Sequence, residues 1–182
     1  MAKKSEWCAE KIMKSLAKVA KFEKRPLLME RVPNKIFGEI VYLTDGCACF
    51  PIIATEYNAL ADKCNCPKEQ NINKSIYDMI KTMYNESDEA KATNFYYQTR
   101  HGRVVTIYET KKEYTLVDVR YTDIIDYLPT ALRGYAVHSN DIKTPVSCYN
   151  ENCDLGYVIL PIHDRYRTMD DELKSLCYKL NF

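Results

Sequence analysis

The sequence predicts an α+β fold in which helices pack on an antiparallel sheet. Three observations support this prediction. The first is an amphipathic segment near the start of the chain. The second is a series of short β-prone segments separated by turn signals. The third is the length of 182 residues, which suits one well-buried core and is too short for two ordinary domains. We therefore expect a single domain over residues 1–182.

The first expected element is an amphipathic helix over residues 5–22. Apolar residues recur at the 3.6-residue helical period and define one face. This face contains Cys8, Ile12, Leu16 and Val19, and it is widened by Trp7, Met13 and Ala20. We expect Pro26 to end the helix near Lys24, because a proline disfavours helical conformation in the residue before it.

A hairpin and two helices are expected next. The elements, in order, are a turn at 33–35, strands over 36–43 and 47–53, helices over 54–63 and 75–84, and a charged loop or helix end over 85–93. Asp45-Gly46 between the two strands is a strong hairpin signal. The residues expected to face inward from the second helix are Ile76, Met79, Ile80 and Met83.

The second half of the chain is expected to be richer in strands. The expected strands cover 94–99, 104–109, 114–119, 134–138, 146–149 and 157–162. A helix is expected over 121–128, ending near Pro129. A last amphipathic helix is expected over 169–180, with three residues facing inward, Leu173, Leu176 and Cys177.

The net charge of +1 conceals an uneven distribution. Residues 1–35 carry ten Lys and Arg against four Glu, and the rest of the chain carries 16 against 21 acidic residues. A basic segment on a slightly acidic body indicates a contact with a polyanion. A solvated helix face explains the same pattern, and the sequence leaves both interpretations open.

The basic residues of the first helix form the main candidate site. Lys11, Lys14, Lys18 and Lys21 recur at spacings of three and four, so they form a stripe on one side of a helix, which Arg25 would extend if the helix continued that far. Such a line of cations matches the phosphate rows of double-stranded DNA. Contacts of this kind give affinity and little sequence readout. We therefore predict that these five residues bind DNA.

The eight cysteines allow two interpretations, zinc ligands or buried thiols. Cys47 with Cys49 and Cys64 with Cys66 form two C-x-C pairs, and four thiolates could hold zinc. Zinc knuckles usually space their cysteines further apart, and free cysteines are often buried. We favour core thiols and predict no metal site, with a zinc-binding module as an alternative.

No enzyme signature is recognisable in the sequence. The chain has no phosphate-binding loop, dinucleotide fingerprint, nucleophile elbow or zinc protease motif. The three histidines, His101, His138 and His163, are scattered. We therefore predict no catalysis and no cofactor. No signal peptide and no membrane-spanning run is evident, so the expected location is a reducing cytoplasm.

Several short segments suggest a relationship to a known family. They are Val41-Tyr-Leu-Thr-Asp-Gly-Cys-Ala-Cys-Phe50, Val117-Asp-Val-Arg-Tyr121, Ile124-Ile-Asp-Tyr-Leu128, Pro145-Val146 and Tyr157-Val-Ile-Leu-Pro-Ile162. The first resembles the strand–TDG–strand element of the bacterial DNA sliding clamp, and the last resembles the terminal Y-V-I-x-P-[IM] strand of that family. The resemblance implies clamp-like elements at 5–53 and 94–162 with an insertion at about 60–92.

This resemblance also implies a homo-oligomer with DNA-facing helices. A clamp subunit repeats its domain, however, whereas this chain shows it once. The expected helix over 121–128 also carries Asp123 and Asp126, where a DNA-facing helix is basic. These departures argue against a closed sliding ring.

The overall character of the chain supports a further hypothesis. Its size, its lack of an active site and its content of Tyr and Lys look like those of the larger phage anti-CRISPR inhibitors of type II effector nucleases. The main hypothesis is thus a non-catalytic phage or mobile-element protein that binds DNA, a DNA-acting enzyme or both, most concretely as an anti-CRISPR inhibitor of a type II CRISPR nuclease. A clamp-like replication accessory factor, as a homodimer or larger ring, is the alternative.

Overall fold

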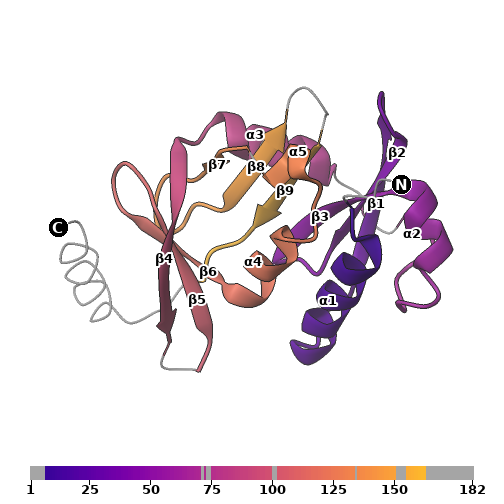
Figure 1. Cartoon of the computed structure of the whole chain (residues 1–182), viewed down its shortest axis with the longest axis horizontal. Helices are drawn as coiled ribbons and strands as arrows, with labels where there is room; N and C mark the ends of the chain where they lie inside the picture. The colour runs from indigo at the N-terminus through magenta and orange to yellow at the C-terminus, as the bar shows by residue number, and fades with distance from the viewer. Residues whose placement is uncertain are drawn as a thin grey trace, which may run out of the picture.

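An antiparallel sheet runs through the described part of the molecule (Figure 1). The computed structural model describes residues 7–70, 72, 75–99, 102–133, 135–150 and 155–162. Within these residues the sheet has nine strands in the order β1-β2-β3-β9-β8-β7-β4-β5-β6. The strands are β1 (Leu28–Asn34), β2 (Gly38–Thr44), β3 (Ala48–Ile53), β4 (Glu89–Gln98), β5 (Val104–Glu109), β6 (Tyr114–Asp118), β7 (Val137–His138), β8 (Val146–Asn150) and β9 (Leu155–Ile159). Each pairs antiparallel with its neighbours, which confirms the predicted α+β class.

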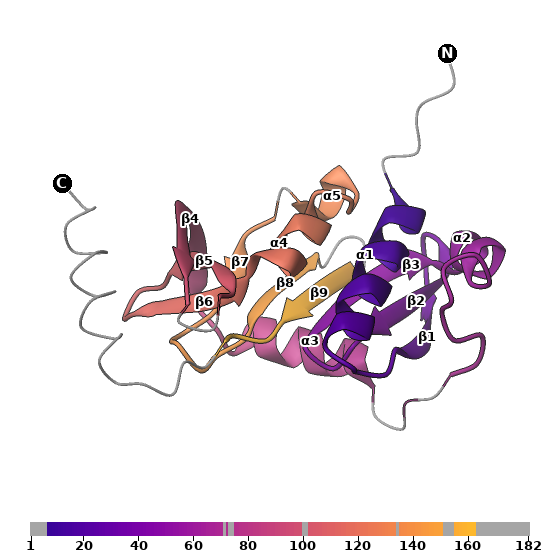
Figure 2. The same cartoon turned by 90° about the horizontal axis from the view of Figure 1, so that it is seen from below.

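Helices cover both faces of the sheet (Figures 1 and 2). Their bounds are α1 (Ala9–Phe22), α2 (Ala54–Leu60), α3 (Ile76–Asn85), α4 (Val119–Ile125) and α5 (Thr130–Arg133). Figure 2 shows α1, α4 and α5 on one face and α3 on the other. The helix α1 packs against α4 and against β3, so its apolar face forms part of the main core.

The helix α1 shows how the sequence pattern becomes structure. Its inner face is completely buried at Ile12, Met13 and Leu16, as the helical period predicts. The backbone then turns left-handed at Lys24, with φ +55°. The N–H of Arg25 donates to the Ala20 carbonyl, and that of Lys24 donates to the Lys21 carbonyl. This pairing is a Schellman cap, and it takes Arg25 off the helix axis.

The turn between β2 and β3 is held by its own side chains. The Asp45 carboxylate accepts hydrogen bonds from the N–H groups of Cys47 and Ala48, at 2.9 and 3.0 Å. The Thr44 hydroxyl accepts one from the N–H of Gly46 at 2.9 Å. Gly46 has φ +84°, a conformation that glycine adopts without strain. The Asp45-Gly46 hairpin signal is therefore confirmed.

Helix α3 approaches β8 and β9 closely at Gly156. A Cβ atom at this position would lie 2.8 Å from the Cys148 carbonyl oxygen and 2.9 Å from a methyl group of Ile80. The glycine thus allows the helix and the sheet to meet. The segment 60–92, interpreted as an insertion, therefore contributes α3 to the main core through Ile76 and Ile80.

Several expected elements differ from the structure. The strand β1 was not predicted and includes two residues of the expected turn, because Leu28–Asn34 pairs with β2 along its full length. The expected loop at 85–93 was wrong in its second half, since β4 begins at Glu89 and its first residues pair with β7. The expected strand over 134–138 is reduced to Val137–His138, and the short helix α5 was not predicted.

Two expected core residues are wrong. Cys8 precedes α1 and is exposed, because its backbone hydrogen bonds to Tyr127 where the chain enters the helix. Met79 is exposed on α3, since the inner face of this helix consists of Ile76 and Ile80. The expected helix over 169–180 lies outside the described residues.

Candidate functional site

The outer side of α1 borders an open groove of about 720 Å³. Lys14, Lys18 and Lys21 line it from the helix, and Lys63 lines it from the loop after α2. All four lysines are exposed. We call these four residues the lysine face. It unites three of the predicted DNA-binding lysines with Lys63, which the sequence analysis missed because it lies more than 40 residues away in the chain.

The lysine face is only partly neutralised. Lys14 and Lys63 both contact the Glu10 carboxylate, at 2.6 and 2.9 Å. The hydrogen bond from Lys14, followed by that from Lys63, lowers the pKa of Glu10. Within the part of the chain that the structure describes, Lys18 and Lys21 form no ion pair. Two cations are therefore available for an external anion.

Lys11 does not line the groove, although its spacing suggested one stripe. Its ammonium group lies 5.1 Å from the centroid of the Tyr127 ring, just beyond α4. This distance is within the range of a cation–π contact. The structure therefore separates Lys11 from the other three predicted lysines.

Arg25 lies beyond the end of α1, so it does not extend the helical stripe, although it lines the same groove as Lys14, Lys18 and Lys21. The Schellman cap turns Arg25 toward the sheet, where its guanidinium lies 3.4 Å from Asp45 and donates to the Tyr121 hydroxyl at 2.9 Å. Asp45 is buried, and Tyr121 also donates to it. Burial, followed by this hydrogen bond, raises the pKa of Tyr121. Arg25 borders the groove, but its charge is directed to a buried carboxylate.

Glu23 joins this contact to a wider ionic network. Its carboxylate lies 2.7 Å from Arg120, 2.9 Å from Arg103 and 3.6 Å from Arg25. Burial raises the pKa of Glu23, but the hydrogen bond from Arg120 and the nearby arginine charges outweigh burial, so the pKa lies below its ordinary value. The side chain of Glu23 is only 11% exposed, so water screens these contacts less than at an open surface.

Asp118 completes the network. It accepts a hydrogen bond from the Arg120 N–H at the start of α4 and also pairs with the Arg120 side chain. The hydrogen bond to Asp118 is the main cause that raises the pKa of Arg120. We call these six charged residues the arginine network, namely Glu23, Arg25, Asp45, Arg103, Asp118 and Arg120. Its pairings have no local signal in the sequence, because its members lie in four separate segments.

The network joins two segments that suggested the clamp resemblance. Asp45 belongs to the Thr44-Asp45-Gly46 turn, and Tyr121 ends the Val117–Tyr121 segment. Their side chains meet although 76 residues separate them. The contact gives both segments a structural role in holding α4 and the β2–β3 turn together.

The four cysteines of the C-x-C pairs lie in different settings. Cys49 is buried on β3, whereas Cys64 and Cys66 are buried in the loop after α2. Burial raises the pKa of Cys66 to about 12. Of the residues with described positions, no three His, Cys, Asp or Glu side chains form a group that could hold a metal ion.

The acidic residues of α4 and the one described histidine have local explanations. Asp123 and Asp126 are exposed at the end of α4, and partial desolvation of the Asp123 carboxylate, followed by the nearby charge of Asp126, raises the pKa of Asp123. His138 places Nδ1 2.9 Å from the Tyr84 carbonyl oxygen and 2.8 Å from that of Ser87. His101 and His163 lie outside the described residues.

Comparisons with known proteins add no family. No protein-family model matches the sequence, and neither the curated proteins nor the solved structures yielded a match. In the described part of the chain, no helix is long and apolar enough to cross a membrane.

Proposed function

We propose that this protein is a non-catalytic DNA-binding protein that holds the phosphate backbone on the lysine face. The observation that carries the proposal is the pair Lys18 and Lys21, which is exposed beside the groove and has no acidic partner among the described residues. Phosphate contacts by such ammonium groups release counterions from DNA, so they favour binding with little dependence on sequence.

The surroundings of this pair support the same proposal. Glu10 is the acidic residue that contacts the lysine face, and it lies at the Lys14 end of the helix. The Lys21 end lies beside Arg25, whose partners are Asp45, Tyr121 and Glu23. Among the described residues, no carboxylate forms an ion pair with Lys18 or Lys21, so a phosphate backbone that follows α1 can contact both ammonium groups.

A titration of a short labelled DNA duplex tests this proposal. We expect the affinity of the wild-type protein to fall steeply between about 50 and 200 mM salt. The Lys18→Glu/Lys21→Glu variant should bind at least about tenfold more weakly at low salt, with a salt slope smaller by about two. Fluorescence anisotropy measures both quantities.

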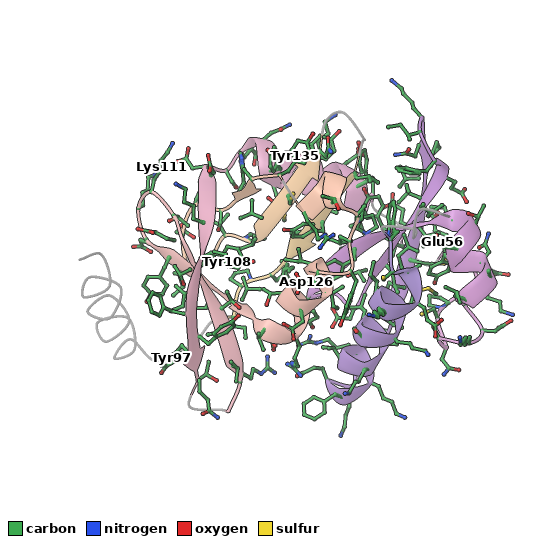
Figure 3. All side chains as sticks on the ribbon, viewed as in Figure 1. Glu56, Tyr97, Tyr108, Lys111, Asp126 and Tyr135 are labelled. Atoms are coloured by element: carbon green, nitrogen blue, oxygen red, sulfur yellow. The ribbon has the colours of Figure 1, made fainter. Side chains whose placement is uncertain are left out.

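The matched control is Lys111→Glu/Lys112→Glu, which changes the net charge by the same amount. Lys111 lies in the β5–β6 turn, at the end of the molecule away from α2 (Figure 3). Its exposed ion pair with Asp88 contributes little to stability. An equal loss of affinity in both variants would show that net charge alone causes binding. Absence of wild-type binding at low salt, both to the duplex and to a single strand of the same length, would refute the proposal.

Two more specific functions remain predictions. As an anti-CRISPR inhibitor of a type II nuclease, the protein would stop DNA cleavage by that purified nuclease. As a clamp-like replication factor, it would form a closed homo-oligomer, and light scattering would detect the ring. A strict monomer in solution would exclude the clamp-like version and leave the proposed DNA contact unaffected.

A further inference from the structure

Phe22, the last residue of α1, presents an aromatic ring to solvent beside the lysine face. It is 76% exposed, more than any other large apolar side chain in the described residues. Single exposed apolar residues are common, so exposure alone implies nothing. Three further observations at Phe22 distinguish it.

The first observation is an arginine held against the ring. The Arg120 guanidinium lies 5.5 Å from the centroid of the Phe22 ring. Glu23 and Asp118 fix the position of that guanidinium through ion pairs at 2.7 and 2.5 Å. Because Arg120 is held by two carboxylates, it provides a fixed neighbour for the ring at little entropic cost.

The second observation is a hollow beside the ring. Its volume is about 510 Å³, and it is lined by Phe22 together with both apolar and charged residues. The other lining residues are Glu23, Gly102, Arg103, Val104, Asp118, Val119 and Arg120. A planar ligand that lies against Phe22 therefore has space and hydrogen-bonding groups at its edge.

The third observation is the position of Phe22 relative to the unpaired lysines. Lys18 and Phe22 are four residues apart in α1, so they are neighbours on one side of the helix. Lys21 directly precedes Phe22. A phosphate on either lysine therefore brings the adjoining nucleotide close to the aromatic ring.

We infer that Phe22 stacks on an unpaired nucleobase while the lysine face holds the adjoining phosphates. Cationic grooves combined with exposed aromatic rings are the general means of binding single-stranded nucleic acid. Bases within an intact duplex have both faces covered by their neighbours, so only an unpaired base offers a face to Phe22. The inference rests on the proposed function and specifies its substrate class as single-stranded DNA.

The decisive probes are two oligonucleotides of equal length, one of deoxythymidine and one made entirely of abasic sites. Both carry the same phosphates, and only the first carries bases. Phe22→Ala should weaken binding of the first by about fivefold or more, which is the usual effect of losing one stacked base. Binding of the abasic probe should change by less than about twofold. The matched control is Tyr96→Ala, which removes an aromatic side chain 66% exposed on β4.

Phe22→Trp gives a second and independent readout. The variant keeps an aromatic surface, so it should bind the thymidine probe as tightly as the wild type. The natural chain has one tryptophan, Trp7, which is buried. The added indole should therefore dominate any change in tryptophan fluorescence. The thymidine probe should quench this fluorescence, and the abasic probe should not.

The outcomes separate the inference from the function on which it rests. Equal binding of both probes by the wild type, or full thymidine binding by Phe22→Ala, would overturn the stacking inference while the lysine contacts still hold. If the Lys18→Glu/Lys21→Glu variant bound the abasic probe as the wild type does, the proposed phosphate contact would itself be refuted. Quenching of the Phe22→Trp variant by the abasic probe would also overturn the inference.

Discussion

The lysine face and the arginine network adjoin at the C-terminal end of α1 and use their positive charges in different ways. Lys18 and Lys21 are exposed and have no acidic partner among the described residues, whereas Arg103 and Arg120 share Glu23 as a partner. The lysines keep their hydration and can exchange it for phosphate contacts. The guanidinium groups of the two arginines have instead replaced part of their hydration with contacts to a carboxylate of the same chain.

This difference shows that the sign of a charge does not establish its role. Arginine suits the partly buried network because its planar group can contact several acceptors at once and is weakly hydrated. Lysine suits the open face because its ammonium group is strongly hydrated and its stem is flexible. Arg25, only four residues after Lys21, therefore belongs to the network by its contacts and not to the face.

The largest effect on stability is expected when the buried carboxylate of the network is removed. Asp45→Ala eliminates the acceptor for Cys47, Ala48, Tyr121 and Arg25. The free energy of unfolding should fall by about 3 kcal/mol or more, because buried donors lose their partner. Urea denaturation measures this change. Lys18→Ala, the control from the face, should change stability by less than about 0.5 kcal/mol. Similar stabilities for the two variants would contradict the distinction between the regions.

A direct comparison removes one charge from each region. Arg25→Gln should lower the free energy of unfolding by about 1–2 kcal/mol, since it leaves Asp45 with fewer partners. It should change the affinity for DNA by less than about twofold, because its charge is already paired. Lys21→Gln should show the reverse, with unchanged stability and weaker binding. Equal losses of DNA affinity in the two variants would show that Arg25 contacts DNA as Lys21 does.

The smallest effect on stability is expected when the pH is lowered. The pKa of Glu23 lies below its ordinary value of 4.5, so the folded protein binds fewer protons here than the unfolded chain does. Glu23 therefore stabilises the fold above about pH 4.5, and this contribution is lost as the pH falls through the lowered pKa. Urea midpoints measured from neutral to acidic pH should fall less steeply below pH 4.5 for Glu23→Gln than for the wild type. Identical slopes would mean that Glu23 does not couple the network to pH.

Features set by neighbouring residues were predictable. The inner face of α1 follows from the helical period at Ile12 and Leu16, and the β2–β3 turn follows from Asp45-Gly46. The strand β1 was missed because charged residues and Pro33 interrupt its apolar pattern, and pairing with β2 overrides that weak signal. The close approach at Gly156 has no local signal either, because the neighbour that requires it is α3.

The sequence by itself determined that positive charge gathers at residues 1–35 and that the lysines of the first helix lie opposite its apolar face. Both properties depend on residues within a few turns of one another. Only the tertiary structure decided which cations remain open. The contact from Asp45 to Tyr121 spans 76 residues and that from Glu23 to Arg120 spans 97. Partners so far apart meet only when the sheet and helices pack. That packing places Arg25 in the arginine network and leaves Lys18, Lys21 and Phe22 at the surface.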